Sequence, residues 1–240
     1  MCSTLATIGL AADGAFADYI VVPSDNVYKL PDQIGYEVGS FCEPLAVAIH
    51  ACTKANLIPG DTVAVVGGGP IGLLVLQAAK ASGAGRVFVI EPIAERGEVA
   101  QKLGATAVFN PAAVNPGKEI ANVTDGLRAA VTFECAGPPV AMLMALSVSG
   151  RGGKIIEVGQ MTEPCEFPFG SFFWHDKTVI ASQGYEHEFP AAIAFLADGR
   201  VNVEPIITAR IRLNDIIEQG FNVLAGEQKN QYLKILVSPS

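Results

Sequence analysis

Two apolar segments joined by a glycine-rich turn constrain the fold of this chain more than any other feature. The segment Thr62–Val66 is short and rich in β-branched residues, and it follows a Pro-Gly-Asp turn, so it predicts a buried strand. Residues 70–82 are dominated by leucine, alanine and other helix formers, and they predict a helix. A Gly-x-Gly-x-x-Gly pattern at residues 67–72 therefore falls where a strand turns into a helix.

Each glycine of that pattern has a physical role at such a turn. The first allows a tight bend, the second lets the backbone approach a pyrophosphate, and the third lets the helix pack closely on the strand. A diphosphate placed there would meet N–H groups at the positive end of the helix dipole. The backbone expected to bind it belongs to Gly67, Gly69, Pro70, Ile71 and Gly72.

An acidic residue after the next strand makes the pattern more specific, because a glycine turn alone is common. Arg86–Ile90 predicts a second buried strand, and Glu91 follows 24 positions after Gly67 (91 − 67). That is near the spacing of the carboxylate that binds the adenosine ribose of a dinucleotide. The same carboxylate would repel a 2′-phosphate, so we expect NAD rather than NADP. Arg96 could bind a 2′-phosphate, so the choice between NAD and NADP stays open.

Composition narrows the possible partners. Half of the 240 residues are hydrophobic, 17% are charged, and the net charge is −8, which argues against binding to nucleic acid or to an anionic membrane surface. No apolar run reaches the roughly eighteen residues of a membrane span, and the first residues lack a basic leader. The five cysteines are scattered and odd in number, as in reduced thiols. We therefore expect a cytoplasmic protein.

Strands and helices continue to alternate after Glu91, which predicts an α/β fold. Six strands with crossover helices predict a doubly wound parallel sheet, entered by a helix at residues 43–55. The two chain ends predict short strands and a smaller, mostly β unit. The later strands of the sheet are expected at 106–109, 129–135, 153–158 and 177–181, and its later helices at 93–103, 115–123 and 138–148. The ends predict strands at 15–22, 26–29, 206–213 and 232–237 and helices at Phe189–Ala197 and 214–224.

Several longer motifs together resemble one family, the zinc-dependent medium-chain alcohol dehydrogenases, with the polyol, 2,3-butanediol and threonine dehydrogenases as the nearest subgroup. The resemblance covers essentially the whole chain. The motifs are GAFADYIVVP at 14–23, CEPLAVAIHA at 42–51, PGDTVAVVGGGPIG at 59–72, FECAG at 133–137, GGKIIEVG at 152–159, IITARIRL at 206–213 and KILVSP at 234–239.

The resemblance implies a function and a division into domains. It implies NAD-dependent hydride transfer between the nicotinamide ring and a small secondary alcohol or polyol, and assembly into a homodimer or tetramer. It implies that residues 1–42 are a remnant of a GroES-like catalytic domain and that 43–184 form a Rossmann domain. Residues 185–240 would end that domain and return to the catalytic one. Backbone lining the nicotinamide half would come from Cys135, Ala136, Val158 and Gly159.

The chain also departs from the family, because it lacks the N-terminal third that supplies a catalytic zinc site and a four-cysteine zinc lobe. Cys2 matches the last cysteine of that lobe. Glu43 matches a glutamate that lies at the catalytic zinc in polyol and butanediol enzymes, although it also suits a helix start ahead of Pro44. Glu43 alone cannot hold zinc, because a catalytic site needs three protein ligands. Turnover is therefore expected to be impaired, and the alternative is a non-catalytic NAD-binding module or partner subunit.

Two further residues have competing interpretations. His50 lies inside an apolar helical segment, which favours a structural histidine over a catalytic one. Glu134 ends the strand expected at 129–135, where it could line the cofactor or be a buried structural carboxylate. His175 and His187 have charged neighbours and are expected at the surface.

Overall fold

The computed structural model describes residues 6–239, which form two compact units. The larger unit is Gln33–Ile206. The smaller unit combines the described residues up to Asp32 with those from Ile207 onward.

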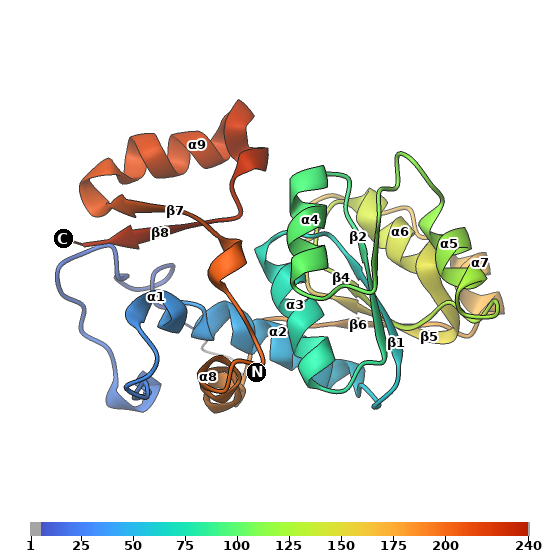
Figure 1. The fold of residues 1–240 in the computed structure, drawn as a ribbon, viewed down its shortest axis with the longest axis horizontal. Coiled ribbons are helices and arrows are strands. Elements are labelled where there is room, and N and C mark those ends of the chain that lie inside the picture. The colour runs from blue at the N-terminus through green and yellow to red at the C-terminus, as the bar shows by residue number, and fades with distance from the viewer. Residues whose placement is uncertain (1–5, 240) are drawn as a thin grey trace. The chain divides into compact units, whose positions relative to one another are not determined.

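The larger unit is built on one six-stranded parallel sheet (Figure 1). Its strand order is β3-β2-β1-β4-β5-β6, with every neighbouring pair parallel. The order reverses between β1 and β4, and the doubly wound parallel sheet expected from the sequence is confirmed. The strands are β1 (Thr62–Val66), β2 (Arg86–Ile90), β3 (Ala107–Phe109), β4 (Ala129–Glu134), β5 (Ser149–Glu157) and β6 (Thr178–Ala181).

Helices cover both faces of this sheet, with α3 and α4 on one side and α5 and α6 on the other (Figure 1). The central strands are buried on both faces, which explains why their sequences are apolar runs instead of alternating patterns. On one face Val66, Phe88 and Ile155 pack against α6. The helices are α1 (Tyr36–Gly39), α2 (Cys42–Ala55), α3 (Pro70–Ala81), α4 (Ala94–Lys102), α5 (Pro116–Asn122), α6 (Pro139–Val148), α7 (Phe169–Trp174) and α8 (Phe189–Ala197), followed by the 3₁₀ turn η2 (Glu204–Ile206).

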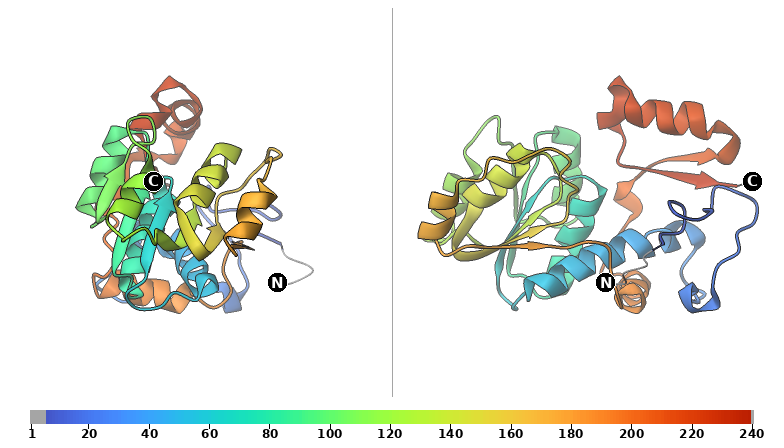
Figure 2. Two further views of the ribbon diagram at one scale, coloured as in Figure 1. Left: turned by 90° about the vertical axis from the view of Figure 1, so that its right-hand side faces the viewer. Right: turned by 180° about the vertical axis from the view of Figure 1, so that it is seen from behind.

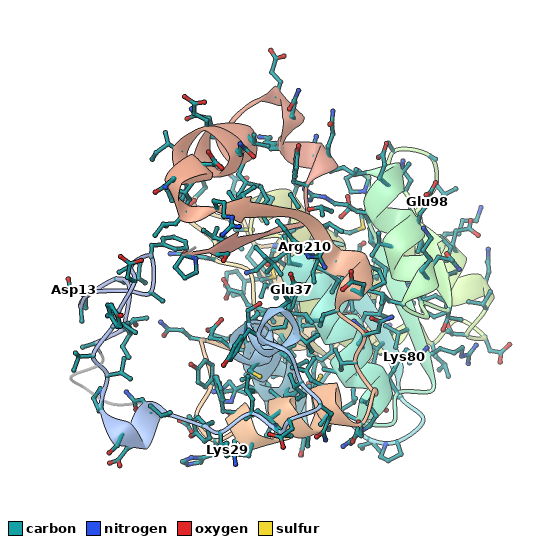
Figure 3. The ribbon with its side chains drawn as sticks, turned by 60° about the vertical axis from the view of Figure 1, so that its left-hand side comes forward. Asp13, Lys29, Glu37, Lys80, Glu98 and Arg210 are labelled. Atoms are coloured by element: carbon teal, nitrogen blue, oxygen red, sulfur yellow. The ribbon has the colours of Figure 1, made fainter. Side chains whose placement is uncertain are left out.

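Basic side chains bind backbone carbonyl groups at or just beyond the C-terminal ends of helices. Such carbonyls lack intrahelical partners and lie at the negative end of the helix dipole, so a cation stabilises them. Lys80 of α3, labelled in Figure 3, donates to the carbonyl of Gly104 just after α4 at 2.8 Å. The others are Arg86 to Val123, Arg128 to Ser147, Arg151 to Trp174, Lys154 to Ala55, and Lys177 to Leu146 and Ser149.

The smaller unit contains a two-stranded parallel sheet (Figure 2). Its strands are β7 (Ile207–Arg212) and β8 (Lys234–Ser238). The helix expected at 214–224 is split into short turns of different pitch. These are the 3₁₀ turn η3 (Leu213–Asp215), the π-helical turn η4 (Ile216–Phe221) and α9 (Asn222–Ala225), and the 3₁₀ turn η5 (Glu227–Gln231) follows.

The strands predicted at 15–22 and 26–29 are wrong. Both segments are irregular, and the 3₁₀ turn η1 (Ser24–Asn26) lies between them. Tyr19 and Val21 are 93% and 98% exposed. A strand needs a neighbour to satisfy its backbone groups, and within the described residues neither segment has one. Among the residues described, the strands of this unit are therefore β7 and β8, and the only other β pairing is an isolated bridge between Ile8 and Ala12.

No helix among residues 6–239 is both long and apolar enough to cross a bilayer. Within the same range the cysteines are free thiols, and Cys42 and Cys52 are buried. Cys2 lies outside the described residues.

Candidate functional site

The glycine turn lies between β1 and α3. Gly67 has a φ of +101°, a left-handed conformation that favours glycine, and its N–H donates to the carbonyl of Ile90 at 2.9 Å. A side chain at Gly67 would place its Cβ 3.0 Å from the Cβ of Ala136 in the loop after β4. The first glycine therefore allows both the tight bend and close packing against the neighbouring loop.

The other two glycines have different surroundings. Gly69 is the N-cap of α3, with Pro70 and Ile71 opening the helix, and a Cβ built on Gly69 meets nothing within 4 Å. Its outer side is open to an approaching group. A Cβ on Gly72 would lie 1.8 Å from the carbonyl oxygen of Gly67, so only glycine allows the helix to begin this close to the turn.

Glu91 follows β2 and is held against the glycine turn. Glu91 is buried, with 5% of its surface exposed. One carboxylate oxygen accepts the N–H of Gly68 at 2.6 Å, and the other accepts the N–H of Ile93 at 2.8 Å. Each carboxylate oxygen has the capacity to accept one further hydrogen bond. The contact with Gly68 was not predicted, although a carboxylate at the tip of β2 was.

Arg96 lies in the first turn of α4 and is half-buried. Its Nε is buried and has no hydrogen-bond partner among the described residues. Helix α4 begins at Ala94, three positions after Glu91. Arg96 therefore belongs to the element next to the proposed ribose site.

The predicted nicotinamide-side residues form two loops held together by Glu134. The N–H groups of Val158 and Gly159 both donate to the carbonyl oxygen of Glu134 at 2.9 Å. The N–H of Cys135 donates to the carbonyl of Val66 at 2.8 Å, and Ala136 donates to the Glu134 side chain at 2.7 Å. Burial, with smaller contributions from Glu134 and Cys52, raises the pKa of the Cys135 thiol well above its ordinary value. The Cys135 side chain is therefore a neutral thiol near neutral pH.

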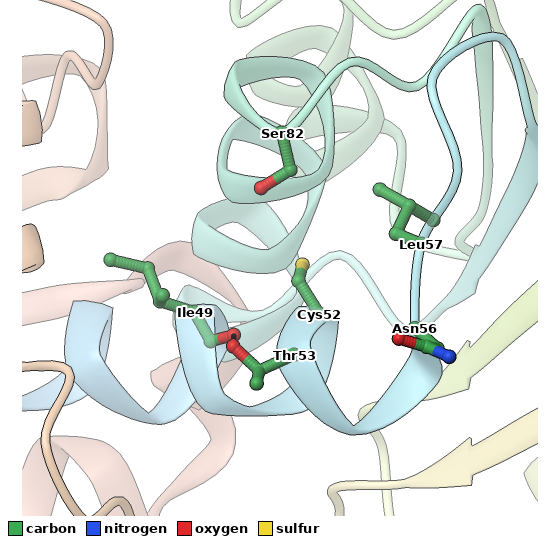
Figure 4. Close-up of a pocket in the computed structure, with 6 residues that line it drawn as sticks. All are labelled: Ile49, Cys52, Thr53, Asn56, Leu57 and Ser82. Atoms are coloured by element: carbon green, nitrogen blue, oxygen red, sulfur yellow. Dashed lines mark hydrogen bonds between the residues drawn. The ribbon is translucent and has the colours of Figure 1, made fainter.

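A separate hollow of 240 Å³ lies between the C-terminal ends of α2 and α3 (Figure 4). Burial raises the pKa of the Cys52 thiol there to about 12, so the group is unreactive at neutral pH. Ser82 follows the last residue of α3, whereas the glycine turn precedes its first, and the hollow is distinct from the site above. Its lining is Ile49, Cys52, Thr53, Asn56, Leu57 and Ser82.

Comparison with known proteins identifies the family. Residues 70–198, more than half of the chain, match the family model of zinc-binding dehydrogenases. The chain is 36% identical over 234 residues to (R,R)-butanediol dehydrogenase of Bacillus subtilis, covering 97% of this chain and 67% of that enzyme. This chain belongs to the zinc-dependent medium-chain alcohol dehydrogenase family. The resemblance inferred from the motifs is confirmed.

Further similar proteins include solved structures that contain different cofactors. The chain spans 64% of the length of a Bacillus subtilis sorbitol dehydrogenase, with 36% identity. A zinc-binding dehydrogenase from Sinorhizobium meliloti, solved with NADP, superposes with a TM-score of 0.91 at 29% identity, covering 100% of this chain and 70% of that one. An alcohol dehydrogenase from Escherichia coli CFT073, solved with NADH, has a TM-score of 0.90 at 26% identity, with coverage of 99% and 69%.

The zinc centre of the family does not fit the described residues of this chain. Within residues 6–239 no group of three or more His, Cys, Asp or Glu side chains is arranged to hold a metal ion. Glu43 lies in the first turn of α2 and is exposed. His50 is 7% exposed and contacts Glu188 at 2.8 Å, and His175 contacts the carbonyl of Ser171 at 2.6 Å. Glu43 and His50 both belong to α2, but the described residues bring no third donor to them.

Proposed function

We propose that this chain binds NAD and takes part in hydride transfer between the nicotinamide ring and a secondary alcohol or polyol. The observation that carries the proposal is the pairing of an open Gly69 with a carboxylate, Glu91, held at the same turn. The diphosphate would lie on the backbone of residues 67–72, and Glu91 would accept the adenosine ribose hydroxyls. The backbone at Cys135, Ala136, Val158 and Gly159 would line the nicotinamide half.

NAD is favoured over NADP by the position of Glu91. Its carboxylate is anchored by two backbone N–H groups and cannot readily turn away from a 2′-phosphate. The Sinorhizobium meliloti relative was solved with NADP, so the family uses both cofactors. Arg96, whose Nε has no hydrogen-bond partner in the described part of the chain, is the residue that would have to neutralise a 2′-phosphate here.

The chain's contribution to the chemistry is binding and orientation. Bound NAD supplies the acceptor for the hydride. The residues around the glycine turn would fix the diphosphate, and the loops after β4 and β5 would restrict the ring. Zinc polarises the substrate oxygen in complete family members, but the described donors of this chain do not form such a site, so no step is assigned to zinc. We therefore propose that turnover by this chain alone is impaired.

The alternative is a non-catalytic module that binds NAD and a partner subunit. Among the described residues no three metal ligands come together, and this favours the alternative. Measurement of NADH binding by calorimetry, together with zinc content per chain, separates the cases. Binding with one zinc per chain supports a complete enzyme, and binding without zinc supports the module. Absence of NADH binding would contradict the proposal in both forms.

Self-association through β6 is part of the proposal. This strand is at one edge of the sheet, and its Val179 is 38% exposed. The neighbouring α7 exposes large aromatic side chains, with Phe173 and Trp174 at 72% and 74%. An uncovered apolar edge strand invites pairing with another copy. A homodimer, or a tetramer built from it, would cover this surface.

Residues 43–184 would act as the cofactor-binding domain, with 1–42 and 185–240 belonging wholly or partly to a catalytic domain. The free cysteines support a reducing compartment, which we propose to be the cytoplasm.

A further inference from the structure

A buried carboxylic acid lies at the centre of the sheet's carboxyl edge. Glu134 is the last residue of β4 and is 0% exposed. It is paired with Val66, which immediately precedes the glycine turn, and with Glu157 of β5. Its position is therefore between the proposed diphosphate site and the loop after β5.

One carboxyl oxygen of Glu134 shapes the loop that follows β4. This oxygen accepts the N–H of Ala136 at 2.7 Å and the N–H of Gly137 at 2.8 Å. The resulting turn presses Ala136 against Gly67, where an added Cβ would be 3.0 Å from the Cβ of Ala136. Through this contact Glu134 fixes the loop relative to the glycine turn.

The second carboxyl oxygen is buried without a hydrogen-bond partner among the described residues. It faces Gly159, where an added Cβ would lie 2.7 Å from it. An ionised oxygen left buried and unpaired is costly, and a cation placed near it would reduce that cost. Burial raises the pKa of Glu134 and Glu157 adds to this, while the N–H groups of Gly137 and Ala136 oppose it.

The sheet order shows which half of a dinucleotide would lie over this acid. Glu91, at the tip of β2, is on one side of β1, and β4 is on the other. With the diphosphate at the end of β1 and the adenosine ribose at Glu91, the nicotinamide half extends over β4 and β5. Oxidised nicotinamide is a cation and reduced nicotinamide is neutral, so a buried acid beneath it can distinguish them by charge.

We propose that Glu134 positions the nicotinamide half of the dinucleotide site and favours the oxidised, cationic ring over the reduced, neutral ring. This rests on the proposed function. It acts through the backbone of residues 135–137 and 158–159 and through its charge, because its own atoms are covered. Titratable side chains near Glu134 are Glu157 of β5 and Cys135 of its own loop, and Cys52 of α2 lies near Cys135. The adjoining β1 and α6 carry no titratable side chain.

The test compares the dissociation constants of NAD⁺, NADH and ADP-ribose for the full chain, with ADP-ribose as the probe of the adenosine half. Glu134→Gln should weaken NAD⁺ about five- to twentyfold relative to NADH, and it should leave ADP-ribose affinity unchanged. Glu163→Gln, which removes an exposed carboxylate in the loop after β5, is the matched control and should leave the ratio unchanged.

A second measurement needs no variant. The preference of the native chain for NAD⁺ over NADH should decline as pH falls through the pKa of Glu134, because the protonated acid has no charge. A preference that is independent of pH and equal in Glu134→Gln would overturn the inference while leaving the proposed function intact. If the native chain binds neither NADH nor ADP-ribose, the proposed function fails, and this inference fails with it.

Discussion

Glu91 and Gly68 lie 23 positions apart in the chain and are joined by a hydrogen bond of 2.6 Å between carboxylate and backbone N–H. The tip of β2 is thereby tied to the middle of the glycine turn. The side chain that we propose binds the adenosine ribose thus also holds the loop that would bind the diphosphate. Changes at Glu91 should therefore affect both halves of the adenosine-diphosphate site.

Glu91→Ala should weaken NADH binding about ten- to a hundredfold, because charge-assisted hydrogen bonds contribute about 1.5–3 kcal/mol. Calorimetry measures the change. Glu95→Ala is the matched control, since Glu95 is exposed in the first turn of α4. Equal NADH affinities for Glu91→Ala and the native chain would remove Glu91 from the site.

Gly69→Val should impair cofactor binding without disrupting the fold, whereas Gly72→Ala should disrupt the fold itself. The open surroundings of Gly69 allow a side chain, so the fold should persist while the diphosphate is obstructed. A methyl group at Gly72 would meet the carbonyl of Gly67 at 1.8 Å, so this variant should lower the melting temperature. Thermal unfolding and NADH titration together check both outcomes. Normal NADH binding by Gly69→Val would show that the phosphate lies elsewhere.

Purified protein of full mass should not show rapid zinc-dependent reduction of NAD with 2,3-butanediol or sorbitol. The reason is that the described residues bring together no set of three metal ligands. Absorbance of NADH at saturating alcohol, with and without added zinc, measures this. Fast turnover that is lost on chelation would refute the expectation and show that a metal site is completed in solution.

Val179→Arg should weaken self-association, because it introduces a charge in the middle of the exposed edge strand β6. Val140→Arg is the control, since Val140 is 69% exposed on α6. Light scattering at micromolar concentration should find an oligomer for the native chain and the control, and a smaller species for Val179→Arg. A native chain that is monomeric at that concentration would rule out this interface.

Glu188→Gln should destabilise the fold near neutral pH by about 1–3 kcal/mol. Although burial opposes ionisation, hydrogen bonds from His50 and from the N–H groups of Glu186 and His187 lower the pKa of Glu188 from its ordinary 4.5. A lowered pKa gives stability that is present above 4.5 and is lost as pH falls through the folded value. Urea unfolding from pH 7 to pH 3 should therefore show the native chain and the variant converging in acid. A constant difference in unfolding free energy across that range would contradict the role of ionised Glu188.

The sheet was predictable because its signals are local. β1 and β2 have the bounds expected from their β-branched runs, and the glycine turn and Glu91 follow from spacing alone. The helix α7 was not predicted, since its Phe-Gly-Ser-Phe-Phe-Trp sequence contains glycine and aromatics and has no amphipathic period. The prediction of a strand at 15–22 failed for the opposite reason. Its local pattern suits a strand, but the described residues offer it no partner strand.

Contacts between residues that are far apart in the sequence limited how much of the site could be predicted. His50 and Glu188 are 138 positions apart, and nothing in either neighbourhood indicates the other. The two possible interpretations of Glu134 were equally supported by its position at a strand end. Burial, two N–H donors and an unpaired oxygen become visible only when the loops after β4 and β5 are placed in space.

The basic side chains at the helix ends also determine how the strands align. Both faces of β1 and β2 are apolar, so a shift by one residue would still bury hydrophobic side chains, and the apolar pattern alone specifies the alignment weakly. Such a shift moves each residue about 3.3 Å along the strand. It would withdraw Arg86 from the carbonyl of Val123 and Lys177 from those of Leu146 and Ser149. These cations thus help to fix the register of strands whose buried side chains are nearly all apolar.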